Sequence, residues 1–318
     1  MMLPSGSAGA RILSFGGHQP SNVVTNEDLA EKIDTTDEWI QSRVGIAERR
    51  VAGPEESLQD MATAAGGKAL AASGLEAGDI DLVVVATCTP ETPIPNISAT
   101  VADRMGIASP GAFDVNAACA GFCYALSVAA DAVRAGSARH VLVIGAEKLS
   151  QWLDWTDRTT CVIFADGAGA AVVGPSETPA IGPVVWGSAG DKHEAISIAS
   201  RDTYLTQQGQ TVFRWATTQL NAAANDALDR AGVSPQDLAA FVPHQANLRI
   251  VESLARKLGA TDAVVARDIV TAGNTSAASI PLALSRMLER GEIASGGKVL
   301  ILGFGAGLTY AAQVIEVP

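Results

Sequence analysis

The hydrophobic positions of this chain fall into short continuous runs separated by amphipathic stretches. The runs at 82–86, 141–145 and 299–302 are apolar at almost every position, which is typical of strands buried on both faces. The stretches between the runs show helical periodicity, and several end in glycine, the residue that favours a left-handed helix cap. The pattern predicts an alternating α/β protein whose sheets are covered by helices.

A faint internal repeat divides the chain. Two copies share three anchor positions at identical spacing, offset by 158 residues: Ala69, Gly74 and Asp79 in the first, Ala227, Gly232 and Asp237 in the second. Each copy is predicted to form a helix, a glycine cap, a short turn and a buried strand. We therefore expect two related halves, 1–175 and 176–318, each with a mixed sheet. A chance match in an Ala-rich chain is the alternative.

Three chemically versatile residues, Cys119, His244 and Asn274, follow apolar segments that we interpret as strands. In open α/β sheets ligands bind beyond the carboxyl ends of strands, so the repeat predicts that these residues converge on one pocket. Cys119 also precedes an Ala-rich helix, whose unpaired N–H groups and dipole favour a thiolate. A thiolate is a nucleophile, and covalent chemistry on an acyl group is the first expectation.

Length and composition narrow the class of protein. The 318 residues are 47% hydrophobic and 18% charged, with 31 glycines, as in a compact enzyme with a large core. We expect no apolar run to reach the ~18 residues of a membrane span, and Met1–Gly6 lacks the features of a signal peptide. The four cysteines show no disulfide spacing, so we expect reduced thiols and a cytoplasmic protein. The net charge of −12 disfavours nucleic acid as a general partner.

Four segments together resemble the β-ketoacyl-acyl-carrier-protein synthase III family, the starter condensing enzymes of dissociated fatty acid synthesis. They are Ala-Cys-Ala-Gly-Phe at 118–122, Pro-His-Gln-Ala-Asn at 243–247, Gly-Asn-Thr-Ser-Ala-Ala-Ser at 273–279, and Gly-Phe-Gly-Ala-Gly at 303–307. The second and third are specific, whereas the Gly-rich segment alone is weak. The resemblance runs from Ala10 to the C-terminus. It implies a thiolase-like fold of two duplicated mixed-sheet halves in a layered α-β-α-β-α arrangement.

The resemblance also implies a reaction. Cys119 would accept an acyl group from a CoA thioester, and malonyl-acyl-carrier-protein would then lose CO₂ and attack it. His244 and the Asn274 amide would stabilise the charge on the malonyl thioester oxygen. The backbone N–H groups of Cys119 and Ala306 would form the second oxyanion hole, although many relatives carry Gly where Ala306 stands. No metal or other cofactor is expected.

Residue types at key positions favour the starter class. Elongating condensing enzymes have a second histidine where this chain has Asn274, and degradative thiolases have a cysteine in the segment corresponding to 303–307. Three alternatives stay open: a starter enzyme of a polyketide pathway, a non-catalytic acyl-CoA or carrier-protein binding module, and a simple acyl transferase or thioesterase. Dinucleotide binding by 303–307 is disfavoured, because the segment precedes a strand and opens no helix.

Further segments match substrate-binding positions of the family. The resemblance places Trp39, Arg43 and Arg158 around the adenine and phosphates of CoA, although a core Trp39 and a surface Arg43 are the simpler alternative. It places Gly209 and Asn247 along the pantetheine tunnel. It also assigns Ile94 and Phe213 to the acyl pocket, with the loop of Ile94 reaching the partner subunit of a homodimer. Some acetyl-preferring relatives have Phe at that position, so Ile94 predicts a longer or branched primer.

A basic patch is expected on a helix after His244. Arg249, Arg256 and Lys257 fall on one helical face, and Arg214 is expected to join them. On a chain of net charge −12 this face would attract acidic acyl carrier protein, with a solvated helix face as the alternative. Cys88 and Cys161 are interpreted as inert buried thiols. Cys123 lies one turn after Cys119, but no His or acid completes the spacing of a zinc site.

Overall fold

The computed structural model describes residues 6–318, so most of the Met1–Gly6 segment lies outside the described residues. Two five-stranded sheets have the same strand order, β1-β7-β6-β4-β5 and β8-β14-β13-β11-β12. In both, the first three strands in this order are antiparallel neighbours and the last three are parallel neighbours. The predicted duplication is therefore confirmed in strand order and direction.

The strands match the apolar runs but extend beyond them. The first sheet contains β1 (Gly9–His18), β4 (Leu82–Ala86), β5 (Gly111–Val115), β6 (Val141–Lys148) and β7 (Asp166–Ser176). The second contains β8 (Val185–Ser188), β11 (Ala240–Pro243), β12 (Val264–Val265), β13 (Lys298–Gly305) and β14 (Thr309–Glu316). Two small ribbons are formed by β2 (Val23–Thr25) with β3 (Glu48–Arg50), and by β9 (Ile196–Ser197) with β10 (Thr206–Gln207).

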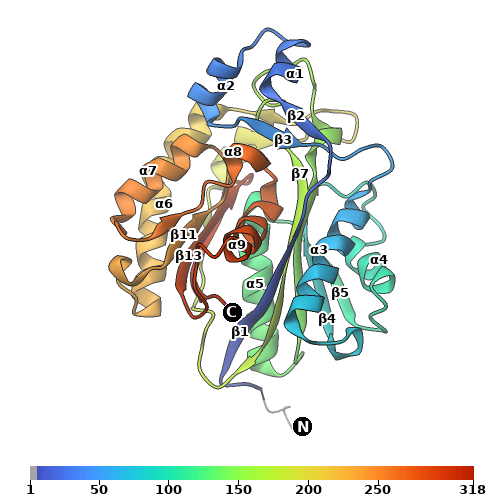
Figure 1. Ribbon diagram of the computed structural model, residues 1–318, viewed down its shortest axis with the longest axis vertical. Helices are drawn as coiled ribbons and strands as arrows, with labels where there is room; N and C mark the ends of the chain where they lie inside the picture. Colours follow the sequence, from blue (N-terminus) through green and yellow to red (C-terminus); the bar gives the residue numbers. More distant parts are fainter. Residues whose placement is uncertain (1–5) are drawn as a thin grey trace.

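Helices complete five layers, which confirms the expected α-β-α-β-α arrangement (Figure 1). The central pair lies between the sheets and contacts strands of both: α5 (Gly121–Ala135) and α9 (Ser279–Glu289). One outer pair covers the first sheet: α3 (Leu58–Ser73) and α4 (Ile97–Arg104). The other covers the second sheet: α6 (Gly209–Ala231) and α7 (Leu248–Leu258). Three shorter helices lie near the site: α1 (Asn26–Ala30), α2 (Asp37–Val44) and α8 (Ile269–Ala272).

The helix α5 explains the most apolar part of the chain. Contrary to the expectation from sequence, the segment Ala118–Ala135 is long and apolar enough to cross a membrane. In the structure 61% of that segment is buried in the protein. Its small residues allow both sheets to approach, and a side chain at Gly121 would lie 3.1 Å from the methyl group of Ala86. Its hydropathy is therefore that of a core helix between two sheets.

One expected element is different. We expected Asn274 to follow a strand, but β12 ends at Val265 and the short helix α8 precedes Asn274. A buried carboxylate at Asp268 and a side-chain acceptor for the N–H of Ile269 stabilise this helical turn. The division of the chain at residue 175 stays a prediction, since α9 of the second half also contacts β1 and β7.

Candidate active site

Cys119 lies in a 3₁₀ turn, Ala118–Ala120, that leads directly into α5. The backbone N–H groups of Cys119 and Ala306 both donate toward its sulfur. Gly305 is required for this approach, because a Cβ there would lie 2.7 Å from the Cβ of Cys119. The two backbone donors predicted to form an oxyanion hole are thus brought together at the sulfur.

The protonation state of Cys119 differs from the expectation. Burial raises the pKa of the thiol to about 12, while hydrogen bonds from Ser276 and from the two backbone N–H groups act in the opposite direction. Desolvation disfavours the charged form, and here it outweighs the donors. The prediction of a resting thiolate is therefore wrong, and the thiol predominates at neutral pH.

His244 follows β11 directly and is 1% exposed. Its Nδ1 lies 2.7 Å from the hydroxyl of Ser279, and the same oxygen accepts a hydrogen bond from the N–H of Gln245 at 3.3 Å. The Ser279 hydroxyl proton is thus available to Nδ1, and we assign the ring proton to Nε2. Burial lowers the pKa of His244 to about 3, so the ring is neutral and can donate from Nε2.

Asn274 is fixed by its backbone and by one side-chain oxygen. Its N–H donates to the carbonyl of Ile163, and its own carbonyl accepts from the N–H of Ala165, both at 2.9 Å. The side-chain Oδ1 accepts from the N–H of Ser276 at 2.9 Å. Because the oxygen is held in this way, the NH₂ group remains as a donor for a ligand.

Cys119, His244 and Asn274 line a single cavity of about 600 Å³. The same cavity extends past residues predicted to contact CoA, pantetheine, primer or carrier protein, namely Arg43, Gly209, Phe213, Arg214, Asn247 and Arg249. The structure therefore brings a thiol and two neutral N–H donors to one cavity, which we call the channel. This arrangement is suited to acyl transfer, with developing negative charge on a carbonyl oxygen.

Trp39 lies beside two arginines, Arg43 and Arg158, and of these three residues Arg43 lines the cavity. Trp39 and Arg43 lie one turn apart on α2, as predicted, and the guanidinium of Arg43 is 5.9 Å from the Trp39 ring centre. Arg158 lies over the same ring at 5.1 Å and donates to the carbonyl of Asp34 at 2.8 Å. An adenine between Trp39 and Arg158 needs about 7 Å, two contact distances. Arg158 therefore has to move outward to complete the predicted adenine site.

A second cavity of about 270 Å³ adjoins Cys119 on the inner side. Its lining is mostly apolar and contains Cys88, Leu149, Phe164, Ile198 and Leu205. Phe213, assigned to the acyl pocket and expected at the mouth of the pantetheine tunnel, lines the larger cavity beneath Arg249, and its contact with the primer stays a prediction. Ile94 is 83% exposed and lines neither cavity of this chain. Its predicted contact with a partner subunit's pocket stays a prediction.

Comparison with known proteins identifies the family. A family model described as 3-oxoacyl-[acyl-carrier-protein (ACP)] synthase III matches residues 113–190, and the model of its C-terminal part matches 228–317. A β-ketoacyl-[acyl-carrier-protein] synthase III of Streptomyces coelicolor is 57% identical over 98% of this chain and 99% of its own length. The chain belongs to the 3-oxoacyl-[acyl-carrier-protein] synthase III family. It is a condensing acyltransferase, as the sequence resemblance predicted.

Solved structures agree with the family assignment. The priming β-ketosynthase of the R1128 polyketide biosynthetic pathway has a TM-score of 0.97 and 44% identity, covering 100% of this chain and 98% of that one. The 3-oxoacyl-[acyl-carrier-protein] synthase III of Aquifex aeolicus has a TM-score of 0.92 and 40% identity, covering 97% and 100%. The thiolase-like fold expected for a synthase III is therefore confirmed.

Sequence reasoning missed a buried acid beside Cys119 of this synthase III. Glu147 is the last residue but one of strand β6 and is fully buried. Its carboxylate accepts hydrogen bonds from the hydroxyls of Thr89 at 2.6 Å and Ser276 at 3.0 Å, and from the thiol of Cys88 at 3.3 Å. Burial raises the pKa of Glu147 and raises that of Cys88 well above its usual range. The sequence signal for this buried acid was a glutamate directly after an apolar run.

Neutralising Glu147 is expected to activate Cys119. The negative charge of Glu147 is one of the causes that raise the pKa of the Cys119 thiol. Glu147→Gln should therefore lower that pKa, so that alkylation of Cys119 by iodoacetamide begins at lower pH than in the wild type. Peptide mapping assigns the modified cysteine, and Cys88→Ala serves as the control for alkylation at the neighbouring thiol. An unchanged pH profile at Cys119 would contradict this interpretation.

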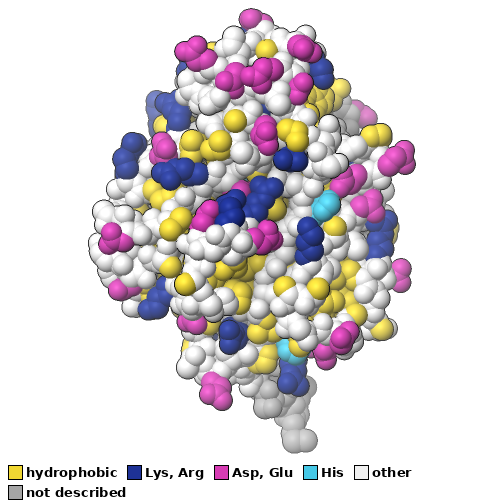
Figure 2. Space-filling view, in the orientation of Figure 1, with side chains coloured by type: hydrophobic (Ala, Val, Ile, Leu, Met, Phe, Trp, Pro, Cys, Tyr) yellow, Lys and Arg dark blue, Asp and Glu magenta, His cyan; other side chains and the backbone are white. Residues whose placement is uncertain are grey.

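The predicted basic patch lies at the channel entrance. Arg249, Arg256 and Lys257 are exposed on α7, and Arg214 is exposed on α6. Arg249 lies over the Phe213 ring at 5.4 Å, and the ammonium of Lys257 donates to a backbone carbonyl of α6. Lys and Arg side chains gather over α7, whereas Asp and Glu side chains gather over α1 and α2 (Figure 2). The charges of this face are therefore unevenly distributed.

The remaining cysteines were considered as metal ligands. Cys123 and Cys161 are buried free thiols. Burial raises the pKa of Cys123 to about 12 and that of Cys161 to about 11. Within residues 6–318, no group of three or more His, Cys, Asp or Glu side chains is arranged to hold a metal ion. The zinc-site alternative at Cys119 and Cys123 thus has no third ligand in the described part of the chain.

Proposed function

We propose that this chain joins an acyl-CoA primer to malonyl-acyl-carrier-protein and releases CoA and CO₂, with Cys119, His244 and Asn274 as its catalytic residues. One observation carries the assignment. The sulfur, held by two backbone N–H groups, shares a cavity with an imidazole and an amide whose other polar atoms are already hydrogen-bonded. The remaining N–H groups are therefore available to a carbonyl oxygen.

In the first step Cys119 attacks the thioester carbonyl of the primer. The S–C bond to Cys119 forms, the bond to CoA breaks, and the thiol proton leaves with CoA as its thiol. The N–H groups of Cys119 and Ala306 stabilise the tetrahedral oxygen. Because the resting thiol is protonated, the nucleophile forms only as the substrate binds. The exchange of one thioester for another keeps the acyl carbonyl electrophilic.

In the second step the malonyl thioester loses CO₂. The electron pair of the broken C–C bond moves toward the thioester oxygen, where Nε2–H of His244 and the NH₂ group of Asn274 would donate. One such donor typically contributes about 3–4 kcal/mol to the transition state. The enolate carbon then attacks the acyl-Cys119 carbonyl, and the sulfur leaves and recovers a proton. A neutral imidazole suits this role, because it donates without needing a proton from solution.

Intact-mass measurement tests the proposal and the primer. Wild-type protein incubated with acetyl-, isobutyryl- or isovaleryl-CoA should gain one acyl mass, and malonyl-acyl-carrier-protein should then yield CO₂ and the 3-oxoacyl product. The inner cavity of about 270 Å³ supports acceptance of the branched primers. A protein that binds acyl-CoA without a covalent adduct would overturn the assigned chemistry. Strict acetyl preference would overturn only the primer prediction.

A starter role in a polyketide pathway is the second candidate. It is favoured by the TM-score of 0.97 with the priming ketosynthase of the R1128 pathway. The chemistry would be the same, and only the carrier protein would differ. Comparison of kcat/KM with a fatty acid carrier protein and a polyketide carrier protein separates the two roles. A higher kcat/KM with the fatty acid carrier protein supports the fatty acid role, and a higher kcat/KM with the polyketide carrier protein supports the polyketide role.

We assign carrier-protein docking to the basic residues at the channel entrance. Charge reversal at Arg249 and Arg256 should raise the KM for malonyl-acyl-carrier-protein about tenfold at low salt, because steering between opposite charges is lost. Acylation of Cys119 by acyl-CoA should change much less. The control is the same reversal at Arg230 and Arg134, which pair with acids elsewhere. An unchanged KM at low ionic strength would argue for a merely solvated helix face.

A homodimer is supported by the edge of the first sheet. The strand β5 pairs with β4 on one side and forms the edge of the sheet on the other. Its Phe113 is 38% exposed, and the exposed Ile94 precedes the nearby helix α4. An edge strand with an exposed aromatic residue is suited to pairing with a second copy. The cytoplasmic location stays a prediction.

A further inference from the structure

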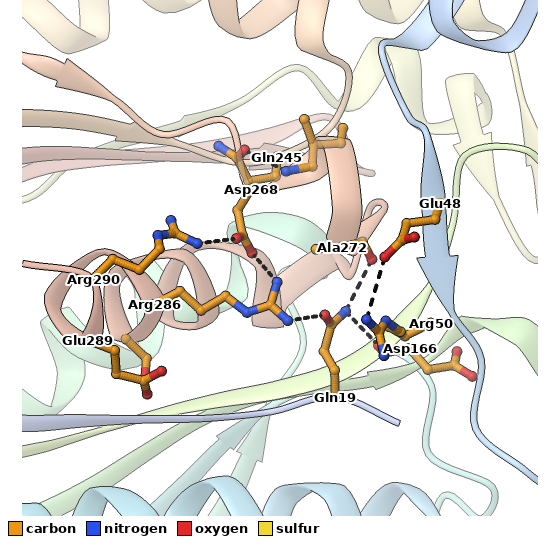
Figure 3. A network of polar contacts seen from close by, with 12 residues as sticks. Gln19, Glu48, Arg50, Asp166, Gln245, Asp268, Ala272, Arg286, Glu289 and Arg290 are labelled. Atoms are coloured by element: carbon orange, nitrogen blue, oxygen red, sulfur yellow. Dashed lines mark hydrogen bonds and ion pairs between the residues drawn. The ribbon is translucent and has the colours of Figure 1, made fainter. Parts of the chain in front are cut away.

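The short helix that precedes Asn274 is held at both ends by polar side chains (Figure 3). The helix α8 contains only Ile269–Ala272, and Gly273 and Asn274 follow it directly. Four residues outside the helix, or just before it, make the contacts: Gln19, Gln245, Asp268 and Arg286. We call these four residues the α8 brace.

Gln245 holds the start of α8. Its Oε1 accepts from the N–H of Ile269 at 3.1 Å, and its Nε2 donates to the carbonyl of Pro243 at 2.8 Å. The side chain is 1% exposed, so these hydrogen bonds are shielded from water. Because Gln245 follows His244 directly, the loop that carries the imidazole is tied to the helix that leads to Asn274.

Arg286 connects the start of α8 with its end. One guanidinium nitrogen donates to the buried carboxylate of Asp268 at 3.0 Å, and another donates to Oε1 of Gln19 at 2.6 Å. Gln19 in turn donates to the carbonyl of Ala272, the last residue of α8, at 3.1 Å. A planar guanidinium holds both partners in fixed directions, which a lysine ammonium does not do.

The brace also joins the two halves of the molecule. Gln19 follows β1 of the first sheet, and its amide donates to the carbonyl of Asp166 at 3.3 Å as well. Arg286 is on α9, seven residues after Ser279, whose hydroxyl contacts His244. One helix therefore carries the partner of the imidazole and the partner of the Asn274 helix. A displacement of about 1 Å at reacting groups can cost about 10²-fold in rate.

We propose that Arg286 is a positioning residue that holds Asn274 where its amide and the His244 imidazole donate to the same thioester oxygen. Arg286 does not line the channel and acts through Asp268 and Gln19. The inference rests on the proposed role of Asn274 in decarboxylation. It predicts a selective effect, because Cys119 and its two backbone N–H donors lie outside the brace.

The variant Arg286→Met tests the proposal, with Arg290→Met as matched control. Arg290 lies on the same side of Asp268, 3.8 Å from its other oxygen, but has no contact with Gln19. We expect Arg286→Met to lower kcat for decarboxylation and condensation about tenfold, with unchanged KM for malonyl-acyl-carrier-protein and an unchanged rate of Cys119 acylation. Arg290→Met should change kcat less than twofold, and Arg286→Lys should recover part of the loss. The melting temperature of each variant is measured in parallel.

Gln19→Leu provides a second variant that leaves the buried Asp268 paired with Arg286. It removes the contact to Ala272 and should show the same selective loss. The proposal is overturned if both variants keep full kcat, or if acylation and decarboxylation fall together as they would in a loosened fold. Asn274→Asp separates this from the proposed function: if decarboxylation survives Asn274→Asp, the role of Asn274 itself is wrong. If Asn274→Asp loses decarboxylation while Arg286→Met and Gln19→Leu keep it, the role of Asn274 stands and the positioning role of Arg286 is wrong.

Discussion

Replacing Cys119 by alanine is expected to abolish the acyl adduct and to lower the condensation rate by at least about 10⁴-fold, as removal of a covalent nucleophile does in other enzymes. Intact mass after incubation with acyl-CoA measures the first effect, and product formation measures the second. Decarboxylation of the malonyl thioester should persist, because the donors of His244 and Asn274 are held by Ser279 and Ser276. The two half-reactions are thus separated in one variant.

The matched control is Cys123→Ala. Cys123 lies on α5, four residues after Cys119, is fully buried and lines neither cavity. Its variant should therefore retain both the adduct and the turnover. Cys88→Ala is the second control, because Cys88 lines the inner cavity close to Cys119. An adduct that survives in Cys119→Ala, or that maps to Cys88 in the wild type, would sink the assignment of the nucleophile.

The fold could be predicted because the strands are buried on both faces. The runs at 82–86 and 299–302 lie inside the strands β4 and β13. The internal repeat predicted that the two halves contain related sheets. The segment before Asn274 could not be predicted in the same way. We expected a strand at 266–270, but its conformation depends on Arg286, Gln19 and Gln245, which are distant in sequence. Tertiary contacts overrode the local pattern there.

The site was predictable where a residue type limits the chemistry. Cys119, His244 and Asn274 were found because a thiol, an imidazole and an amide at those positions share one reaction. The protonation state of Cys119 was not found, since the helix terminus is visible in sequence but the depth of burial is not. The role of Phe213 stays a prediction for a related reason. Sequence indicates proximity to the substrate, but the orientation of α6 decides which cavity its ring lines.

Replacing Asn274 by aspartate should have the second largest effect. Aspartate keeps an oxygen for the N–H of Ser276, so the loop can retain its hydrogen bond at 2.9 Å. It replaces the NH₂ donor by a second oxygen, which repels the negative charge that develops on the thioester oxygen. We expect decarboxylation to fall by about 10²–10³-fold, the usual effect of losing one such donor.

The measurement is CO₂ release from malonyl-acyl-carrier-protein, set against the rate of Cys119 acylation in the same preparation. Acylation should fall much less, because its oxyanion hole consists of the backbone N–H groups of Cys119 and Ala306, and the added carboxylate acts on it only by raising the pKa of the thiol. Asn247→Asp is the control for the added charge, since Asn247 also lines the cavity and its amide donates to the carbonyl of Arg43. If Asn274→Asp slows acylation and decarboxylation equally, Asn274 supports the cavity as a whole rather than one transition state. A selective loss of CO₂ release places its amide at the malonyl oxygen, because the two steps then depend on separate sets of donors.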